Sequence, residues 1–406
     1  MSRILIVNKF LYPNGGSETY IFELGKQLKK EGHKVQYFGM EDTRNIVGND
    51  IQSYTSNMDF HTGKLGKLIY PFKIIYSREA RKAIRKVLDD FNPEVVHLNN
   101  FNFQITPSII YEIRKYGKQI GQRIKIIFTA HDYQLICPNH MMRCPKTEEN
   151  CSRCIDGAYS NCFKRRCIHN SKIKSLLGTI EATLYKKLKT YKYIDCIICP
   201  SKFMQNQMEH NTALRDRTVY MQNFTTIPKQ EQVRATQESV QDKYVLYFGR
   251  YSKEKGVETL LKVCKELSHV RFVFAGKGPL EDMVNEVNSV ENKGFLTSEE
   301  LRPLIQGAAF SIYPSEWYEN GPFSIMESIQ YGTPVIGAAI GGIPELIDDG
   351  ETGELFESGN VEQLREKISR LWSDDETVNK YCKGCSDKKF MTLEAYCEEL
   401  YEILGF

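Results

Sequence analysis

Two glutamates eight residues apart, Glu319 and Glu327, are the first candidates for the side chains of a catalytic or ligand-binding site. They belong to the run YPSEWYENGPFSIME, residues 313–327, which predicts the end of a strand, a polar and aromatic turn, and then a helix. Gly321 lets a ligand approach the backbone closely, and Pro322 suits the first helical turn. A helix start with free N–H groups binds anions, so an anionic ligand is expected here.

Cations that could neutralise such an anion follow a strand predicted at residues 244–248. Arg250 and Lys255 lie in the segment GRYSKEKG, which begins at Gly249. The Arg250 guanidinium offers a planar fork to phosphate oxygens, and the Lys255 ammonium offers a mobile point charge. From spacing alone, ordinary surface charges remain the alternative.

Glycines and a histidine follow predicted parallel strands in the first half of the chain. Gly15 and Gly16 come after the strand at residues 3–8, and His131 comes after the strand at residues 124–129. Doubly wound sheets bind ligands at the carboxyl ends of their strands. The glycine pair could therefore expose amides to a phosphate, and His131 could donate a hydrogen bond or share in proton transfer. A plain tight turn and a histidine that satisfies loop backbone are the alternatives.

A nicotinamide enzyme is a weaker interpretation of the same strands. Glu41 and Asp42, after the second predicted strand, could mimic an acid that binds ribose. The glycines do not have the G-x-G-x-x-G spacing, however, so the dinucleotide fingerprint is absent. Solvated loop charges explain the two acids better.

Six of the twelve cysteines are concentrated in a segment at about residues 137–169, which predicts an insertion. They are Cys137, Cys144, Cys151, Cys154, Cys162 and Cys167, with His140 and His169 beside them. The C-x-x-C pair has the spacing of a metal knuckle, so a structural zinc ion held by a subset of these thiols is favoured. Free thiols stay open, and disulfides are disfavoured in a reducing compartment. The basic residues that follow could bind an anionic acceptor, a membrane surface or RNA.

A second basic stretch, residues 64–88, has eight Lys or Arg and one acid, with apolar residues at steps of three and four. This pattern predicts a basic amphipathic helix. Such a helix could lie on an anionic membrane, or it could pack its apolar stripe on the domain, which is the plainer interpretation.

The bulk composition excludes several classes of protein. The chain has 406 residues, 41% hydrophobic and 26% charged, and a net charge of +3, which is too small to argue for nucleic acid as a partner. It has no apolar run of the roughly 18 residues that a membrane span requires. A strand begins directly after two residues, so we expect a cytoplasmic protein without a signal peptide.

The elements that must position these residues are two series of strand and helix units. The second series includes strands at 271–275, before the glycine turn of Gly276 and Gly278, and at 292–295, ending on Phe295. The polar run at 229–242 predicts a linker. We therefore predict an α/β fold with two Rossmann-like, doubly wound domains. Their expected boundaries are 1–223, 224–384 and a C-terminal helix within 385–406 that crosses back to the first domain.

The run E-N-G-P-F-S-I-M-E and the pair G-R with K-G five residues later resemble retaining glycosyltransferases of family 4. That resemblance implies the GT-B arrangement, with two Rossmann-like domains facing a cleft. It also implies catalytic roles for His131, Glu319, Arg250 and Lys255, with cations stabilising the departing nucleoside diphosphate. The expected donor-binding set is Gly15, Gly16, Gly249, Arg250, Lys255, Gly276, Gly278, Phe295, Glu319, Asn320, Gly321, Pro322, Phe323, Ser324 and Glu327.

The resemblance implies transfer of a sugar from a nucleoside-diphosphate sugar, without a catalytic cofactor, to a glycan, lipid-linked or other acceptor. A role in cell-surface polysaccharide synthesis, at the inner face of the membrane, is the expected setting. A nucleotide-sugar epimerase or a phosphorylase of the same fold is one rival. A non-catalytic, zinc-bearing module that binds RNA or membrane is the other.

Overall fold

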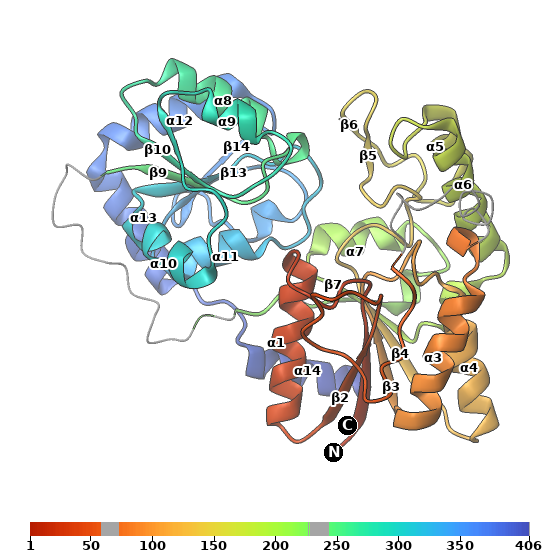
Figure 1. Ribbon diagram of the computed structural model, residues 1–406. Coiled ribbons are helices and arrows are strands. Elements are labelled where there is room, and N and C mark those ends of the chain that lie inside the picture. The colour runs from red at the N-terminus through yellow and green to blue at the C-terminus, as the bar shows by residue number, and fades with distance from the viewer. Residues whose placement is uncertain (58–72, 226, 228–242, 406) are drawn as a thin grey trace. The chain divides into compact units, whose positions relative to one another are not determined.

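The computed structural model describes residues 1–57, 73–225, 227 and 243–405, and it divides into two compact units (Figure 1). The first unit comprises Met1–Gln222 together with Leu393–Phe406, and the second comprises Asn223–Thr392. The chain therefore passes from one unit to the other after residue 222 and again after residue 392.

The first unit is built on a six-stranded sheet in the order β2-β1-β3-β4-β7-β8, in which every pair of neighbours is parallel. The strands are β1 Arg3–Val7, β2 Lys34–Phe38, β3 Val95–Leu98, β4 Lys125–Thr129, β7 Cys196–Cys199 and β8 Thr218–Tyr220. Four central strands are buried along almost their whole length, as parallel strands covered by helices must be. The prediction of a doubly wound α/β unit is confirmed.

Helices connect these strands and cover the sheet. They are α1 Gly16–Lys30, α3 Arg78–Phe91, α4 Ser108–Gln119, α6 Lys172–Lys187 and α7 Lys202–Glu209, with a short helix α5 Ser160–Arg165 and the turns η1 Thr190–Tyr193 and η2 Arg215–Arg217. A two-stranded antiparallel hairpin, β5 Arg143–Cys144 and β6 Glu149–Asn150, lies within the cysteine-rich segment.

The prediction of one continuous basic helix over residues 64–88 is wrong in its described part. Ser77 is extended and caps α3 by accepting a hydrogen bond from the Ala80 N–H, so α3 begins at Arg78. Its apolar residues are buried and Arg81 pairs with Glu112 at 2.6 Å, so the stripe packs on the domain. Residues 64–72 lie outside the described part.

The second unit repeats the architecture with a parallel six-stranded sheet in the order β11-β10-β9-β12-β13-β14. The strands are β9 Val245–Phe248, β10 Phe272–Ala275, β11 Val290–Asn292, β12 Phe310–Tyr313, β13 Val335–Ala338 and β14 Gly353–Phe356. The helices are α8 Val257–Glu266, α9 Glu281–Asn285, α10 Ser298–Gly307, α11 Phe323–Gln330, α12 Val361–Ser373 and α13 Asp375–Asp387, with the turns η5 Lys253–Lys255 and η6 Ile343–Glu345.

Two predicted boundaries in the second unit need correction. The strand expected at 292–295 is β11, which ends at Asn292, so Phe295 stands on a loop with 70% of its surface exposed. The helix expected to open at residues 320–322 begins at Phe323, because Pro322 is still extended at ψ 121° and serves as the N-cap.

The last helix, α14 Leu393–Leu404, belongs to the first unit and packs beside α1. Its Tyr396 is fully buried and its hydroxyl lies 2.7 Å from the hydroxyl of Tyr20 in α1. None of the helices in the described ranges is long and apolar enough to cross a lipid bilayer.

Candidate active site

Adjacent strands place two loops of the second unit side by side. Strands β9 and β12 pair directly, so the loops that follow them leave the same edge of the sheet. The loops are joined by the Glu316 N–H, which donates to the Glu254 carbonyl at 2.9 Å, and the Ser315 hydroxyl oxygen lies 3.2 Å from the same carbonyl oxygen. The sheet therefore brings the predicted cations and the first glutamate into one region.

Gly256 makes this approach feasible. Its φ is +71°, and a Cβ there would lie 1.8 Å from the Pro314 carbonyl oxygen of the neighbouring loop. Any side chain at this position would push the two loops apart. Gly256 thus allows the two loops to pack closely, and this packing holds Lys255 in position.

Lys255 and Glu319 form an ion pair, with 2.6 Å between the ammonium nitrogen and Oε1. The Lys255 side chain is 23% exposed and the Glu319 side chain 7%. The ammonium also lies 3.3 Å from the Tyr313 hydroxyl and 5.4 Å from the centre of the Trp317 ring. Burial lowers the pKa of Lys255, but the Glu319 carboxylate outweighs burial and the net pKa is raised, so Lys255 is a cation at neutral pH.

Three donors converge on one oxygen of Glu319. Besides Lys255, the Ser315 hydroxyl donates to Oε1 at 2.9 Å and the Trp317 indole N–H at 2.5 Å. Within the described ranges, every hydrogen bond to this carboxylate falls on Oε1. The other oxygen, Oε2, is consequently the one that can accept from a ligand.

The backbone of Glu319 is held as firmly as its side chain. Its carbonyl accepts a hydrogen bond from the Gly342 N–H at 2.7 Å. At Gly341, φ is +60° and a Cβ would come within 2.4 Å of that carbonyl oxygen. The glycine pair after β13 therefore supports the glutamate from behind.

Arg250 stands on the same loop as Lys255 but extends into solvent. Its carbonyl accepts from the Tyr247 hydroxyl at 2.9 Å and from the Ser252 N–H at 3.0 Å, while the residue itself is exposed. The backbone is thus fixed and the guanidinium remains accessible to a ligand.

Gly276 and Gly278 pack this loop against the next one. A Cβ at Gly276 would lie 1.9 Å from the Gly249 carbonyl oxygen, and one at Gly278 would lie 2.3 Å from that of Tyr251. The two glycines have a structural reason to be there, apart from any contact with a donor.

The N-terminus of α11 carries no side-chain cap. The residues before and at its start, Gly321 to Ser324, are partly exposed, and the Gly321 carbonyl accepts from the Asn223 amide at 2.8 Å. Glu327 lies one turn inside the helix, where burial raises its pKa to about 7. The helix start can accept an anion, and Glu327 can exchange a proton near neutral pH.

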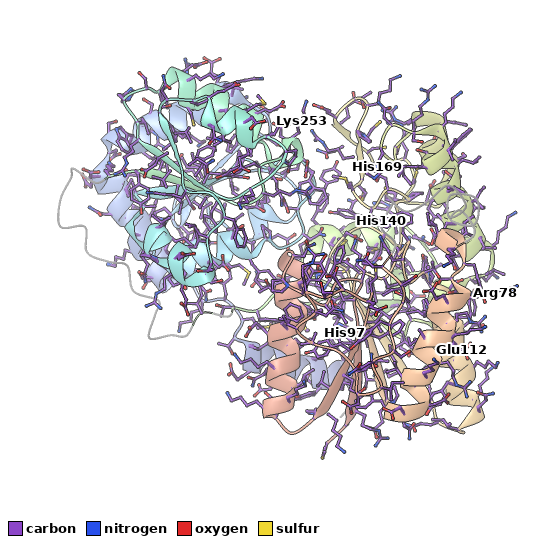
Figure 2. All side chains as sticks on the ribbon, in the orientation of Figure 1. Arg78, His97, Glu112, His140, His169 and Lys253 are labelled. Atoms are coloured by element: carbon purple, nitrogen blue, oxygen red, sulfur yellow. The ribbon has the colours of Figure 1, made fainter. Side chains whose placement is uncertain are left out.

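In the first unit, His131 and His97 are arranged around Tyr20 at the ends of β3 and β4. His131 Nε2 lies 2.8 Å from Asn99 Oδ1, and His97 Nε2 lies 2.8 Å from the Thr129 hydroxyl. The Asn99 amide nitrogen faces the Val7 carbonyl at 3.4 Å, which assigns Oδ1 to His131 and makes Nε2 of His131 the donor. Figure 2 labels His97 in the first unit, where it is fully buried.

Both histidines are neutral. Burial lowers the pKa of His131 to about 3, and burial together with His131 lowers the pKa of His97 to about 3. Tyr20 packs edge-on against His131 with ring centres 4.9 Å apart. His131 can therefore act as a hydrogen-bonding group with a fixed tautomer, and not as a permanent cation.

Gly15 and Gly16 stand at the exposed start of α1, with Gly15 as its N-cap. Behind them the Asn8 amide donates to Glu18 Oε1 at 2.8 Å, and the Ser17 hydroxyl donates to the same oxygen at 2.9 Å. Hydrogen bonds among Asn8, Ser17 and Glu18 therefore fix the backbone at the helix start where the glycine pair lies.

The six predicted zinc ligands are all free thiols, and five of them line one cavity of about 10 Å³. Those five are Cys137, Cys151, Cys154, Cys162 and Cys167. Across the described part of the chain, no three or more His, Cys, Asp or Glu side chains are arranged to hold a metal ion. The zinc prediction accordingly stays a prediction.

Sequence reasoning assigned no role to the groups that hold the predicted ones. Ser315, Trp317 and Tyr313 surround the ion pair, and Asn99 orients His131. Their only signal in the sequence is that each lies at or just after the carboxyl end of a strand.

Two family models match this chain. "Glycosyltransferase Family 4" matches residues 14–225 and "Glycosyl transferases group 1" matches residues 228–385. The chain is 27% identical to the uncharacterized glycosyltransferase MJ1178 of Methanocaldococcus jannaschii over 52% of this chain and 58% of the relative, so it spans less than two thirds of that protein. It is 23% identical to N-acetyl-alpha-D-glucosaminyl L-malate synthase of Bacillus anthracis, over 90% of this chain and 87% of the relative.

A solved structure supports the same fold. Anabaena Alr3699/HepE in complex with UDP and glucose superposes with a TM-score of 0.68 over the whole of both chains, at 15% identity. With one family model covering more than half of the residues and a second covering most of the rest, the chain belongs to glycosyltransferase family 4 and has the GT-B fold of two Rossmann-like domains.

Proposed function

We propose that this glycosyltransferase moves a sugar from a nucleoside-diphosphate-sugar donor to a saccharide or lipid-linked acceptor, with retention of the anomeric configuration. The observation that carries the proposal is the ion pair of the partly buried Lys255 with the buried Glu319, in the same unit as an uncapped helix start. A cation and free amides are what a departing diphosphate needs, and no metal ion is required for that task.

Each predicted residue takes a role within its own unit. In the second unit, Arg250, Lys255 and the α11 start bind the diphosphate, Glu327 accepts from ribose hydroxyls, and the exposed Phe295 loop frames the base. Glu319 contacts the donor sugar through Oε2. In the first unit, Gly15, Gly16 and the neutral His131 bind the donor's phosphate and sugar.

The surroundings of Glu319 favour a mechanism in which the acceptor attacks the sugar from the face that the diphosphate leaves. They disfavour a mechanism in which Glu319 forms a covalent glycosyl-enzyme. Three donors on Oε1 withdraw charge from the carboxylate, which makes it a poor nucleophile. Glu319 is better suited to orient the sugar and to stabilise positive charge that develops on it. We therefore assign it an electrostatic role in the transition state.

A panel of nucleotide sugars tests donor binding. UDP-, GDP- and ADP-sugars are added to the protein, and the ligand that binds the native state raises the melting temperature. UDP is the first candidate, since it is bound in the solved structure described above. No shift with any of them would contradict the proposal.

Turnover is then measured with the donor that binds. Glu319→Ala should lower kcat by at least about a hundredfold, as the loss of a key electrostatic group does. Glu316→Ala is the matched control, because Glu316 lies in the same loop but bonds Thr259 instead of Lys255. Proton NMR of the product reports the anomeric configuration. Epimerised donor without acceptor, or an unchanged rate in Glu319→Ala, would favour the rival functions.

For the cysteine-rich segment we propose a structural zinc ion. Thiolates are zinc's usual structural ligands, and five thiols share one cavity. The neighbouring Cys162 thiol lowers the pKa of Cys167, which favours a thiolate there. Elemental analysis of the purified protein should find zinc, and a zinc-free protein with its activity and melting temperature intact would refute this.

A further inference from the structure

Helix α14 lies beside α1 and brings Tyr396 against Tyr20 (Figure 1). Neither tyrosine has any exposed surface, and their rings meet edge to face, with 5.8 Å between the ring centres and 85° between the ring planes. Their hydroxyl oxygens are 2.7 Å apart. Tyr396 is therefore joined to α1 by a hydrogen bond as well as by packing.

A chain of polar contacts continues from Tyr20 into the sheet. The Tyr20 hydroxyl lies 3.1 Å from that of Thr129 at the end of β4, and the Thr129 hydroxyl lies 2.8 Å from Nε2 of His97 in β3. Thr129 and His97 have no exposed surface either. Burial raises the pKa of both tyrosines and lowers that of His97, so the whole chain of contacts is uncharged at neutral pH.

The Tyr20 ring is the surface against which the His131 imidazole packs. The ring centres are 4.9 Å apart and the ring planes meet at 69°. The imidazole is thus held at Nε2 by Asn99 and along its ring by Tyr20. Because the Tyr20 hydroxyl is itself bonded to Thr129 and Tyr396, the far end of that ring is anchored and the ring cannot swing away from His131.

We infer that Tyr396 is a positioning residue for His131. Its hydroxyl holds the Tyr20 ring, and that ring keeps the imidazole in the orientation in which Nδ1 can accept a hydrogen bond from a sugar hydroxyl. Nδ1 is the accepting nitrogen because Nε2 donates to Asn99. Tyr396 is fully buried, so it acts on the reaction only through its neighbours. The inference rests on the proposed function in one respect, the contact of His131 with the donor sugar.

Tyr396→Phe in the full chain tests the inference, because it removes the hydroxyl and keeps the ring. The variant should lower kcat by at least about fivefold, the factor that the loss of one neutral hydrogen bond produces. The matched control is Tyr401→Phe. The Tyr401 hydroxyl also joins α14 to α1, but through Glu31 at the other end of α1. A wild-type kcat in Tyr396→Phe, or an equal loss in the control, would overturn the inference.

A double-mutant cycle separates positioning of His131 from a general loss of stability. In a His131→Ala background, Tyr396→Phe should cause no further loss of kcat, because no imidazole is left to position. The melting temperature should fall by the same amount in both backgrounds. If Tyr396→Phe lowers kcat by the same factor with and without His131, the hydroxyl acts by another route and the inference is wrong.

NMR of the histidine ring nitrogens in the ligand-free protein tests the positioning without any reaction. The chain has eight histidines, and the signals of His131 are those that disappear in His131→Ala. Wild type should show a neutral ring with its proton on Nε2. Tyr396→Phe should shift or broaden these signals, and Tyr401→Phe should leave them unchanged. Unchanged signals in Tyr396→Phe would overturn this inference alone, whereas a wild type that binds no nucleotide sugar would contradict the proposed function alone.

Discussion

The ion pair of Lys255 and Glu319 predicts opposite effects of its two members on nucleotide binding. In the free protein the ammonium is shared between Glu319, the Tyr313 hydroxyl and two aromatic ring faces. A diphosphate must compete with the carboxylate for that ammonium. Removing the lysine should therefore weaken nucleotide binding, whereas neutralising the glutamate should not.

The size of the effect follows from the hydrogen bonds involved. A hydrogen bond to a charged group contributes about 1.5–3 kcal/mol, so Lys255→Met should raise the Kd of the bound nucleoside diphosphate by roughly 10- to 150-fold. Glu319→Gln keeps a side-chain oxygen that accepts from the Ser315 hydroxyl, but it removes the charge that holds the Lys255 ammonium. The Kd of this variant for the nucleoside diphosphate should therefore stay the same or fall. Turnover should fall strongly in both variants.

Isothermal titration with the nucleoside diphosphate, free of the sugar, separates these effects, and kcat/KM is measured in parallel. Ser358→Ala is a suitable control, since the Ser358 hydroxyl bonds the Ser315 carbonyl and not the pair. Two results would refute the reasoning: nucleotide binding weakened as much by Glu319→Gln as by Lys255→Met, or a nucleotide Kd that Lys255→Met leaves unchanged. Either would mean that Lys255 does not bind a phosphate of the nucleotide.

Three further predictions use other described residues. The pKa of Glu327 is raised to about 7, so its carboxylate forms as the pH rises from 6 to 8 and can then accept hydrogen bonds from ribose hydroxyls. Nucleotide affinity should therefore rise over this pH range. Calorimetric titration at several pH values should show the rise in wild type and not in Glu327→Gln. Glu181 has a folded-state pKa of about 8, above its unfolded value, so its contribution to stability is lost as pH rises from about 4.5 to 8; Glu181→Gln should raise the melting temperature at pH 8 more than at pH 5, and equal shifts would contradict the linkage. Gly256→Ala should lower the free energy of unfolding of the second unit by about 1–3 kcal/mol, measured by urea unfolding, because the added Cβ meets the Pro314 carbonyl oxygen. Gly359→Ala is the control: φ is +79° there too, but no atom lies within 4 Å of a Cβ, so the loss of stability should be smaller.

Buried parallel strands were the part of the fold that the sequence predicted best. Residues 4–7 and 245–248 are continuous apolar runs, and such short, fully buried runs are typical of parallel strands that helices cover on both faces. Strand β14 and the hairpin of β5 and β6 were not predicted. They are short, and tertiary contacts more than local composition decide them.

The groups that could do chemistry were predictable by type, and their partners were not. Lys255 and Glu319 are 64 residues apart, so their contact depends on the pairing of β9 with β12, which no local pattern encodes. The same is true of Asn99 and His131, which come from neighbouring strand ends. Apolar periodicity also misled at residues 64–88, where the cap at Ser77 divides the stretch.

The return of α14 to the first unit bears on the order in which the chain can fold as it leaves the ribosome. The second unit is one uninterrupted segment, residues 223–392, and can close as soon as it has emerged. The first unit must wait, because Tyr396 of α14 packs in a buried position against Tyr20 and is made only after the whole second unit. Synthesis from the N-terminus would thus complete the unit that begins first after the second unit, and the side of α1 that packs against α14 would stay uncovered until then.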